Sequence, residues 1–144
     1  MNVTVRRARD AAERDAALDL RYRVFCEEQG VPPSDELDGR DGEGVHLVAV
    51  ADDGRVVGTC RLVFVGATVQ FSRLAVEPEW RRRRIASRLL ELADAEARAA
   101  GAHRLVLHAQ TYARELYSAH GYRPRGPTFV EAGIEHVAME KALA

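Results

Sequence analysis

Cysteine is scarce in this sequence: Cys26 and Cys60 stand far apart, and neither has a CxxC partner. Such spacing matches neither a zinc site nor a disulfide framework, and it favours two reduced, mostly buried thiols over a bridge. No apolar run approaches the roughly 20 residues that a membrane-spanning helix needs, and the first residues lack the apolar core of a signal peptide. We therefore expect a cytoplasmic protein without a metal site.

Net charge is also nearly absent, because 21 Lys and Arg residues face 22 Asp and Glu residues, giving −1 at pH 7. This balance gives no overall attraction to nucleic acids or anionic membranes, and we expect neither as a partner. At 144 residues, 47% of them hydrophobic, the chain is large enough to bury one core. We expect a single domain over residues 1–144.

The spacing of apolar residues predicts the elements of the fold. Alternating or continuous apolar runs predict strands at 2–8, 45–51, 55–65, 68–76, 105–108, 122–125 and 134–141. Helices are predicted at 10–30, 83–100 and 111–120, the first capped by Asp10 with Glu13 as its capping-box partner. Residues 34–44 and 129–133 are predicted to be irregular. The order describes a mixed α/β fold.

The strand at 68–76 carries a second signal. Its apolar residues fall at 69 and 71 and then at 74 and 76, so the alternation changes phase near Arg73. A β-bulge produces such a change, because it inserts one extra residue into a strand. The predicted bulge lies close to a run of arginines that follows the strand.

Positive charge is concentrated in that run, at Arg81, Arg82, Arg83 and Arg84, where the helix at 83–100 is predicted to begin. A helix N-terminus has unpaired N–H groups and a partial positive charge, so each exposed cation there costs about 0.3–1 kcal/mol. A polyanionic ligand held by the turn amides and the guanidinium groups would offset this cost. A solvated patch and a nucleic-acid contact are the alternatives, and the strand-to-helix position favours the small anionic ligand.

The segment Arg81-x-x-x-Ile85-Ala86, after a strand that ends at Val76, resembles the acetyl-CoA signature Gln/Arg-x-x-Gly-x-Gly/Ala of the GCN5-related N-acetyltransferase (GNAT) superfamily. Arg84 and Arg82 stand where that signature commonly has glycine, and a helical backbone there would still direct amides to the ligand. The similarity to the ElaA-like branch extends over most of the chain. It includes the segments 21–33, 57–62, 107–110, 116–122 and 129–136.

This resemblance implies a mostly antiparallel sheet that is splayed at the cofactor site and flanked by helices. It also implies transfer of an acetyl group from acetyl-CoA to a primary amine of a small molecule or peptide, by direct attack in a ternary complex. The cofactor-binding positions that it implies are Leu74, Ala75 and Val76 for pantetheine and Arg81, Arg82, Arg83, Arg84, Ile85, Ala86 and Ser87 for the pyrophosphate. The superfamily often dimerises, so a homodimer is also compatible.

Tyr117 lies in a Leu-Tyr-x-x-x-Gly-Tyr pattern, and the resemblance implies that it is the general acid for the departing thiolate. His108 and Glu131 are candidates for the base that takes the amine proton, whereas Glu77 flanks the pyrophosphate turn and is a poorer one. The histidines share no metal-ligand spacing.

Two questions stay open at this level. The acidic segment 35–43 either attracts a cationic amine or is merely solvated. The main alternative to an enzyme is a catalytically silent acyl-CoA-binding module.

Overall fold

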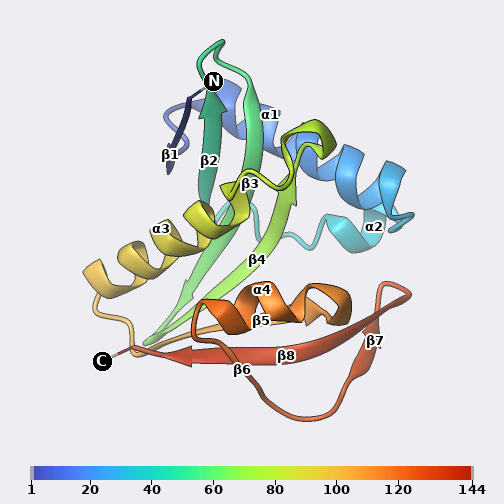
Figure 1. The fold of residues 1–144 in the computed structure, drawn as a ribbon, viewed down its shortest axis with the longest axis vertical. Coiled ribbons are helices and arrows are strands. Elements are labelled where there is room, and N and C mark those ends of the chain that lie inside the picture. Colours follow the sequence, from blue (N-terminus) through green and yellow to red (C-terminus); the bar gives the residue numbers. More distant parts are fainter. Residues whose placement is uncertain (1, 144) are drawn as a thin grey trace.

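The computed structural model describes residues 2–143, which form one eight-stranded sheet in the order β1-β2-β3-β4-β5-β8-β6, with β7 paired to β8 (Figure 1). The first half is an antiparallel meander of β1 (Val3–Arg7), β2 (Val45–Ala51), β3 (Val56–Val65) and β4 (Thr68–Val76). The second half contains β5 (Arg104–Gln110), β6 (Arg123–Pro124), β7 (Phe129–Glu131) and β8 (Ile134–Ala142). Only β4 and β5 pair in parallel, so the predicted mixed, mostly antiparallel fold is confirmed.

Helices cover both faces of the sheet. The longer ones are α1 (Ala11–Arg21), which continues into the π-helical stretch η1 (Tyr22–Glu28), and α3 (Ile85–Ala99). The shorter ones are α2 (Pro33–Glu36), η2 (Pro78–Trp80), η3 (Thr111–Ala113) and α4 (Arg114–Ala119). No helix in the described part of the chain is both long and apolar enough to cross a membrane.

The alternation of β2 explains why two cores form. Leu47 and Ala49 face the larger core, which also contains Leu89 of α3 and Leu105 of β5. Val48 and Val50 face the opposite side, where α1 packs. Because both faces of this strand are buried, its sequence from residue 47 to residue 51 is apolar instead of alternating with polar residues.

The first helix begins as predicted, since the Asp10 carboxylate accepts a hydrogen bond from the Glu13 amide at 2.9 Å. The reciprocal bond differs from a capping box by one residue: the Glu13 carboxylate accepts from the Arg9 amide at 2.8 Å instead of from Asp10. It also forms an ion pair with Arg6 of β1. Glu13 therefore joins the helix to the edge strand, which explains why its geometry departs from the local motif.

Residues 129–133 are not irregular, as the sequence suggested, but form a hairpin. Glu131 pairs with Ile134, and the two residues between them, Ala132 and Gly133, have φ of 52° and 77°. Two successive left-handed residues make a tight turn whose twist matches the flanking strands. The segment 34–44 is also more ordered than predicted, because α2 and a set of ion pairs fix it to the sheet.

Candidate active site

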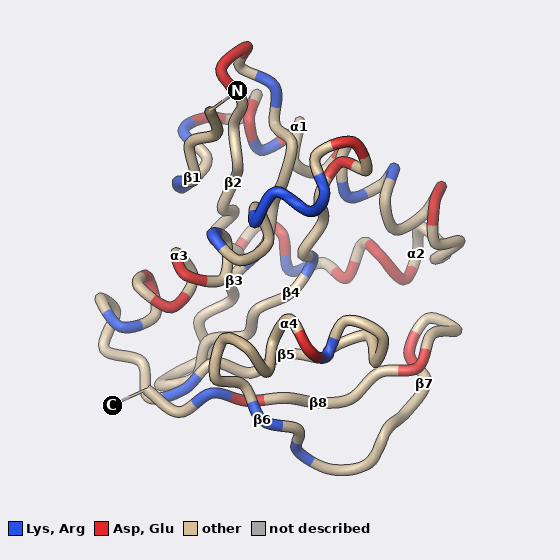
Figure 2. Tube along the Cα trace, in the orientation of Figure 1, with Lys and Arg blue, Asp and Glu red and all other residues tan. Residues whose placement is uncertain are grey.

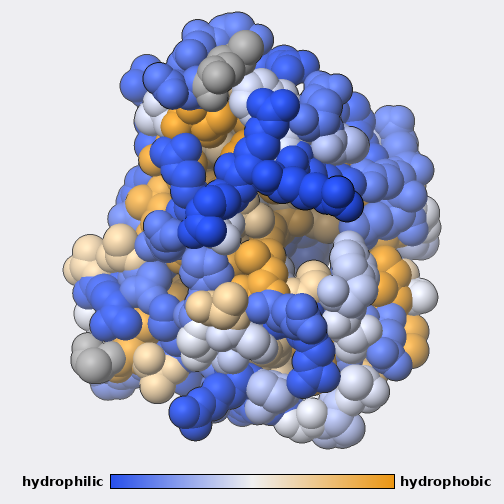
Figure 3. Space-filling model, viewed as in Figure 1, coloured by the Kyte–Doolittle hydropathy of each residue, from blue (hydrophilic) through white to orange (hydrophobic). Residues whose placement is uncertain are grey.

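A cleft opens where β4 and β5 separate. The two strands pair only from Thr68 with Arg104 to Gln70 with Val106, after which β4 continues beside β3 and β5 continues beside β8. The cleft has a volume of about 1140 Å³ and is lined from η1, β4, the arginine turn, β5, α4 and the β7–β8 hairpin. Figure 3 shows it as a hollow with an apolar floor below a hydrophilic ridge. The expected splay of the sheet is thus present.

The main chain of β4 faces this cleft on its unpaired side. The Glu77 amide donates to Val57 of β3 at 2.9 Å, and strand groups alternate in direction, so the amides and carbonyls of Leu74 and Val76 point away from β3. The register between β3 and β4 shifts between Thr59 and Arg61, and Arg73 has a φ of 59°. The predicted β-bulge is confirmed, and it re-aims the strand at the edge of the cleft.

The arginine run forms the turn between β4 and α3 and appears in Figure 2 as an unbroken basic stretch. Its backbone is not the helical one considered from the sequence. Arg82 and Arg84 both have a φ of 63°, in the left-handed region. α3 begins only at Ile85, and the first amide to bond within the helix is that of Arg88, to the Arg84 carbonyl at 3.0 Å. The amides of residues 85–87 therefore have no helical partner and lie at the cleft.

The four arginine side chains have different surroundings. Arg81 forms a two-bond ion pair with Glu28 of η1, at 2.8 and 2.7 Å, and its Nε donates to the Val76 carbonyl at 3.0 Å. Arg82 and Arg84 line the cleft. Arg83 does not line it; its guanidinium lies 4.9 Å from the centre of the Trp80 ring. All other predicted cofactor residues line the same cleft, namely Leu74, Ala75, Val76, Ile85, Ala86 and Ser87.

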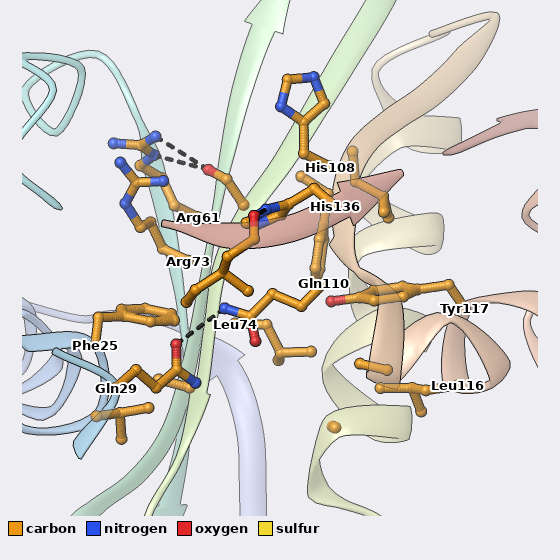
Figure 4. Close-up of a pocket in the computed structure, with 18 of the residues that line it drawn as sticks. Phe25, Gln29, Arg61, Arg73, Leu74, His108, Gln110, Leu116, Tyr117 and His136 are labelled. Atoms are coloured by element: carbon orange, nitrogen blue, oxygen red, sulfur yellow. Dashed lines mark hydrogen bonds between the residues drawn. The ribbon is translucent and has the colours of Figure 1, made fainter. Parts of the chain in front are cut away.

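Tyr117 enters the cleft from α4. Its ring packs edge-on against Phe71, with 6.3 Å between the ring centres, and against Tyr122, at 6.0 Å. The side chain is only 7% exposed, and this burial raises the pKa of Tyr117 well above that of a free phenol. In Figure 4 its hydroxyl points into the cleft towards Gln110. The phenol is thus held protonated at the surface of the cleft.

The two predicted base candidates form a pair. Nδ1 of His108 lies 3.0 Å from Oε2 of Glu131, and both side chains line the cleft while remaining about half exposed. The Phe129 ring packs edge-on against His108, with 5.0 Å between the ring centres. The β7–β8 hairpin therefore brings Glu131 to the β5 strand. Glu77, in contrast, bonds to Arg23 at 2.6 Å and does not line the cleft.

The acidic segment contributes a buried ionic network that sequence reasoning missed. Its carboxylates bind three arginines from three other elements; the members are Glu36, Asp38 and Asp41 with Arg21, Arg61 and Arg73. Arg21 and Arg61 are only 1% and 3% exposed, so each needs this compensation. Hydrogen bonds from Arg61 hold the pKa of Asp38 well below its usual range. These carboxylates are therefore paired with arginines and are not free to attract a cationic amine.

A second unpredicted contact crosses the cleft. The side-chain amide nitrogen of Gln110, at the end of β5, donates to Oε1 of Gln29, just after η1, at 2.9 Å (Figure 4).

The two cysteines are free thiols, as expected, and burial raises the pKa of Cys60. Within residues 2–143 no group of three or more His, Cys, Asp or Glu side chains is arranged to hold a metal ion.

Known proteins resemble this chain in sequence and in fold. The profile of the acetyltransferase (GNAT) domain matches residues 11–143. A protein of Bacillus subtilis strain 168 to which acetyltransferase activity has been ascribed is 34% identical over 128 residues, which cover 87% of this chain and 86% of that protein.

Solved structures agree with the profile. A protein of Lactobacillus plantarum assigned as an N-acetyltransferase has a TM-score of 0.91 at 26% identity, with all of both chains covered. Escherichia coli ElaA has a TM-score of 0.83 at 22% identity, covering 97% of this chain and 98% of its own. An aminoglycoside 6′-N-acetyltransferase, solved in complex with coenzyme A, has a TM-score of 0.75 at 17% identity, covering 99% and 97%. The last two similarities concern the fold alone.

Proposed function

The chain belongs to the acetyltransferase (GNAT) family, and from this premise we propose that it transfers the acetyl group of acetyl-CoA to a primary amine by direct attack in a ternary complex. The acceptor is a small molecule or a peptide. The observation that carries the proposal is the cleft between β4 and β5, which joins an unpaired strand edge to the free amides of a helix N-terminus. These two surfaces suit the two halves of coenzyme A.

The strand edge suits the pantetheine arm. Its amide groups would pair with the cleft-facing main chain of Leu74 and Val76, as an added strand does. The bulge at Arg73 turns this edge away from β5 and leaves the space that such an arm needs. Acetyl-CoA would supply the activated acetyl group as a thioester.

The arginine turn suits the pyrophosphate. Arg82 and Arg84 adopt a left-handed backbone, which glycine adopts without strain, at positions where the signature commonly has glycine. The amides of residues 85–87 add unbonded donors at the helix N-terminus, and the guanidinium groups add charge. Arg83 is assigned no phosphate contact, because it packs on Trp80 instead.

Tyr117 is the proposed general acid. Its buried phenol stays protonated through neutral pH and can release its proton when a thiolate, with an ordinary pKa of about 8–9, is expelled beside it. A thiolate in the same apolar surroundings is a stronger base than in water, which favours this transfer. A strand amide near Val76 is the proposed donor to the oxygen that gains negative charge.

The pair of His108 and Glu131 is the proposed base. An ammonium ion must lose a proton before it can attack, and these side chains lie at the wall of the cleft that β5 and β7 form. The carboxylate orients the imidazole, so that the ring can accept the proton directly or through one water molecule.

A CoA-release assay over polyamines, aminoglycosides, amino acids and lysine peptides tests the proposal. We expect thiol release with at least one amine, and Tyr117→Phe should lower kcat by about 10²–10⁴-fold while acetyl-CoA still binds. Tyr122→Phe is the matched control, because this neighbouring hydroxyl is buried without a hydrogen-bond partner and does not line the cleft. Tight acetyl-CoA binding without release for any amine would instead indicate a silent acyl-CoA-binding module.

A further inference from the structure

One wall of the part of the cleft that would hold the amine substrate has hydrogen-bond donors without partners among the residues that the structure describes. On this wall Arg40 donates from Nη1 to Oε1 of Gln70 at 2.7 Å and from Nε to Glu43, while its Nη2 bonds to no group among residues 2–143. Since the amide oxygen of Gln70 is occupied, its NH2 group remains available. Ser72 accepts two hydrogen bonds from Arg61, at 3.2 and 3.0 Å, which leaves its hydroxyl proton to donate.

Arg73 adds to the same wall from the bulge. Its Nε and Nη2 bond to Glu36, Asp38 and the carbonyl groups of α2, but Nη1 meets no acceptor within the described chain. The side chain is 22% exposed and lines the cleft. Figure 4 shows it beside Arg61 on this wall.

The carboxylates behind this wall cannot serve the spare donors. Both oxygens of Glu36 accept from Arg21, and Oε2 also accepts from Arg73. Both oxygens of Asp38 accept from Arg61, with further bonds from the Arg40 amide and Arg73. Every oxygen of Glu36 and Asp38 is thus used while donors remain on this wall, and a bound group with a negative charge or acceptor oxygens would satisfy those donors.

The opposite wall, formed by β5 and the β7–β8 hairpin, has the reverse character. Gln110 and His136 are register partners and so share a face of the sheet. The Gln110 amide nitrogen is used by Gln29, which leaves its oxygen. His136 donates from Nδ1 to the Ile134 carbonyl at 2.7 Å, so its Nε2 carries the lone pair in the neutral ring. Glu131 retains Oε1, because only Oε2 faces His108.

We infer that the acceptor is an amine that also carries an anionic group, a carboxylate or a phosphate. The anion binds the donors of Arg40, Gln70, Ser72 and Arg73, and the amine faces the acceptors of Gln110, His136 and Glu131. This inference rests on the proposed function, of which it names the substrate class. The separation of donors and acceptors onto facing walls also fixes the direction in which such a molecule lies.

Matched ligand pairs test this inference, measured by calorimetry with coenzyme A bound so that the arginine turn is already neutralised. Leucine is compared with leucinamide, and ethanolamine phosphate with ethanolamine. We expect the member that carries the carboxylate or phosphate to bind about tenfold tighter in at least one pair, as an ionic hydrogen bond provides. The pair with the larger ratio distinguishes a carboxylate from a phosphate. Equal affinities within both pairs would overturn the inference.

Arg40→Gln supplies the variant. Arg40 is half-buried and its guanidinium group takes no part in the buried network, so this substitution should leave the fold intact. It should reduce the affinity ratio towards one without weakening the member that lacks the anionic group, whereas Arg14→Gln, on the exposed face of α1, should change neither. An unchanged ratio in Arg40→Gln would contradict the assignment.

The same ligands separate this inference from the proposed function. Thiol release with every amine regardless of charge would reject only the anionic acceptor. A binding ratio that persists without any thiol release would reject acetyl transfer and leave the anion site standing.

Discussion

Arg82 and Arg84 share a left-handed backbone, with φ of 63° at both residues, at the turn that precedes α3. A left-handed conformation costs a non-glycine residue about 1–2 kcal/mol. The chain therefore keeps two strained arginines where glycine would fit without strain. Within the proposed function, phosphate binding by their side chains is the compensation for this strain.

Arg84→Gly separates strain from charge. Because glycine tolerates this φ, the variant should be more stable by about 0.5–1 kcal/mol in urea denaturation. Its affinity for acetyl-CoA should fall and depend less on salt, since one cation is lost. Arg83→Gly is the control: its φ is not left-handed and its side chain packs on Trp80, so it should be destabilising. If both variants lose stability equally, the turn is not strained.

Gly58→Ala should weaken both folding and cofactor binding. A Cβ atom at Gly58 would lie 2.8 Å from Cγ2 of Ile85, the first residue of α3, and 3.3 Å from the Ala49 side chain. Relieving such overlap costs about 1–3 kcal/mol and would displace the helix start that faces the pyrophosphate. Urea denaturation and acetyl-CoA calorimetry measure the two effects. Gly42→Ala should be neutral, because nothing lies within 4 Å of that position.

The ionic network predicts how stability depends on pH. Asp38 has a pKa in the folded state below its ordinary value of about 3.9, so its contribution is present above that value and is lost as pH falls through the folded pKa. Urea denaturation should show this loss beginning below a pH of about 3.9 and growing as the pH is lowered further.

Asp38→Asn assigns that loss to one residue. The variant should be clearly less stable than the wild type at pH 7, because it leaves the buried Arg61 with one fewer charged partner, and the difference should shrink at pH 3. Asp15→Asn, on an exposed part of α1, should follow the wild-type curve. A difference that stays constant with pH would rule out the role of this carboxylate.

Glu131→Gln tests the proposed base pair. Loss of the carboxylate removes the orientation of His108, so kcat should fall by about 10²-fold or more while acetyl-CoA affinity stays the same. Glu135→Gln, on the same hairpin but outside the cleft, should leave kcat unchanged. Equal kcat values for the two variants would remove Glu131 from the mechanism.

Local patterns were sufficient for most of the fold. The alternation of β4, the phase change at Arg73 and the cap at Asp10 each depend on neighbours within a few residues, and each was predicted. The backbone of Arg82 and Arg84 was not, because arginine gives no local sign of a left-handed conformation. The predicted cofactor and catalytic residues other than Arg83 do gather at one cleft, although their roles remain predictions.

Long-range pairing explains what was missed. The partners Arg21 and Glu36 are 15 residues apart, and Arg73 and Glu36 are 37 apart, so no short window relates them. The composition of the acidic segment 35–43, rich in Asp, Glu and Gly, predicts a solvated loop, because the sequence does not show which arginines face it. The β7 strand was missed for a similar reason: three residues are too few for a periodic pattern.

The sheet consists of two halves that only three residue pairs connect, those from Thr68–Arg104 to Gln70–Val106. The cleft wall that offers hydrogen-bond donors belongs to the β4 half of the sheet. The facing wall, which offers hydrogen-bond acceptors, belongs to the β5–β8 half. A ligand that contacts both halves of the sheet therefore also fixes the distance between the two walls of the cleft. Within the proposed function, thermodynamic linkage then requires that any factor by which coenzyme A changes the affinity for the amine equals the factor by which the amine changes the affinity for coenzyme A.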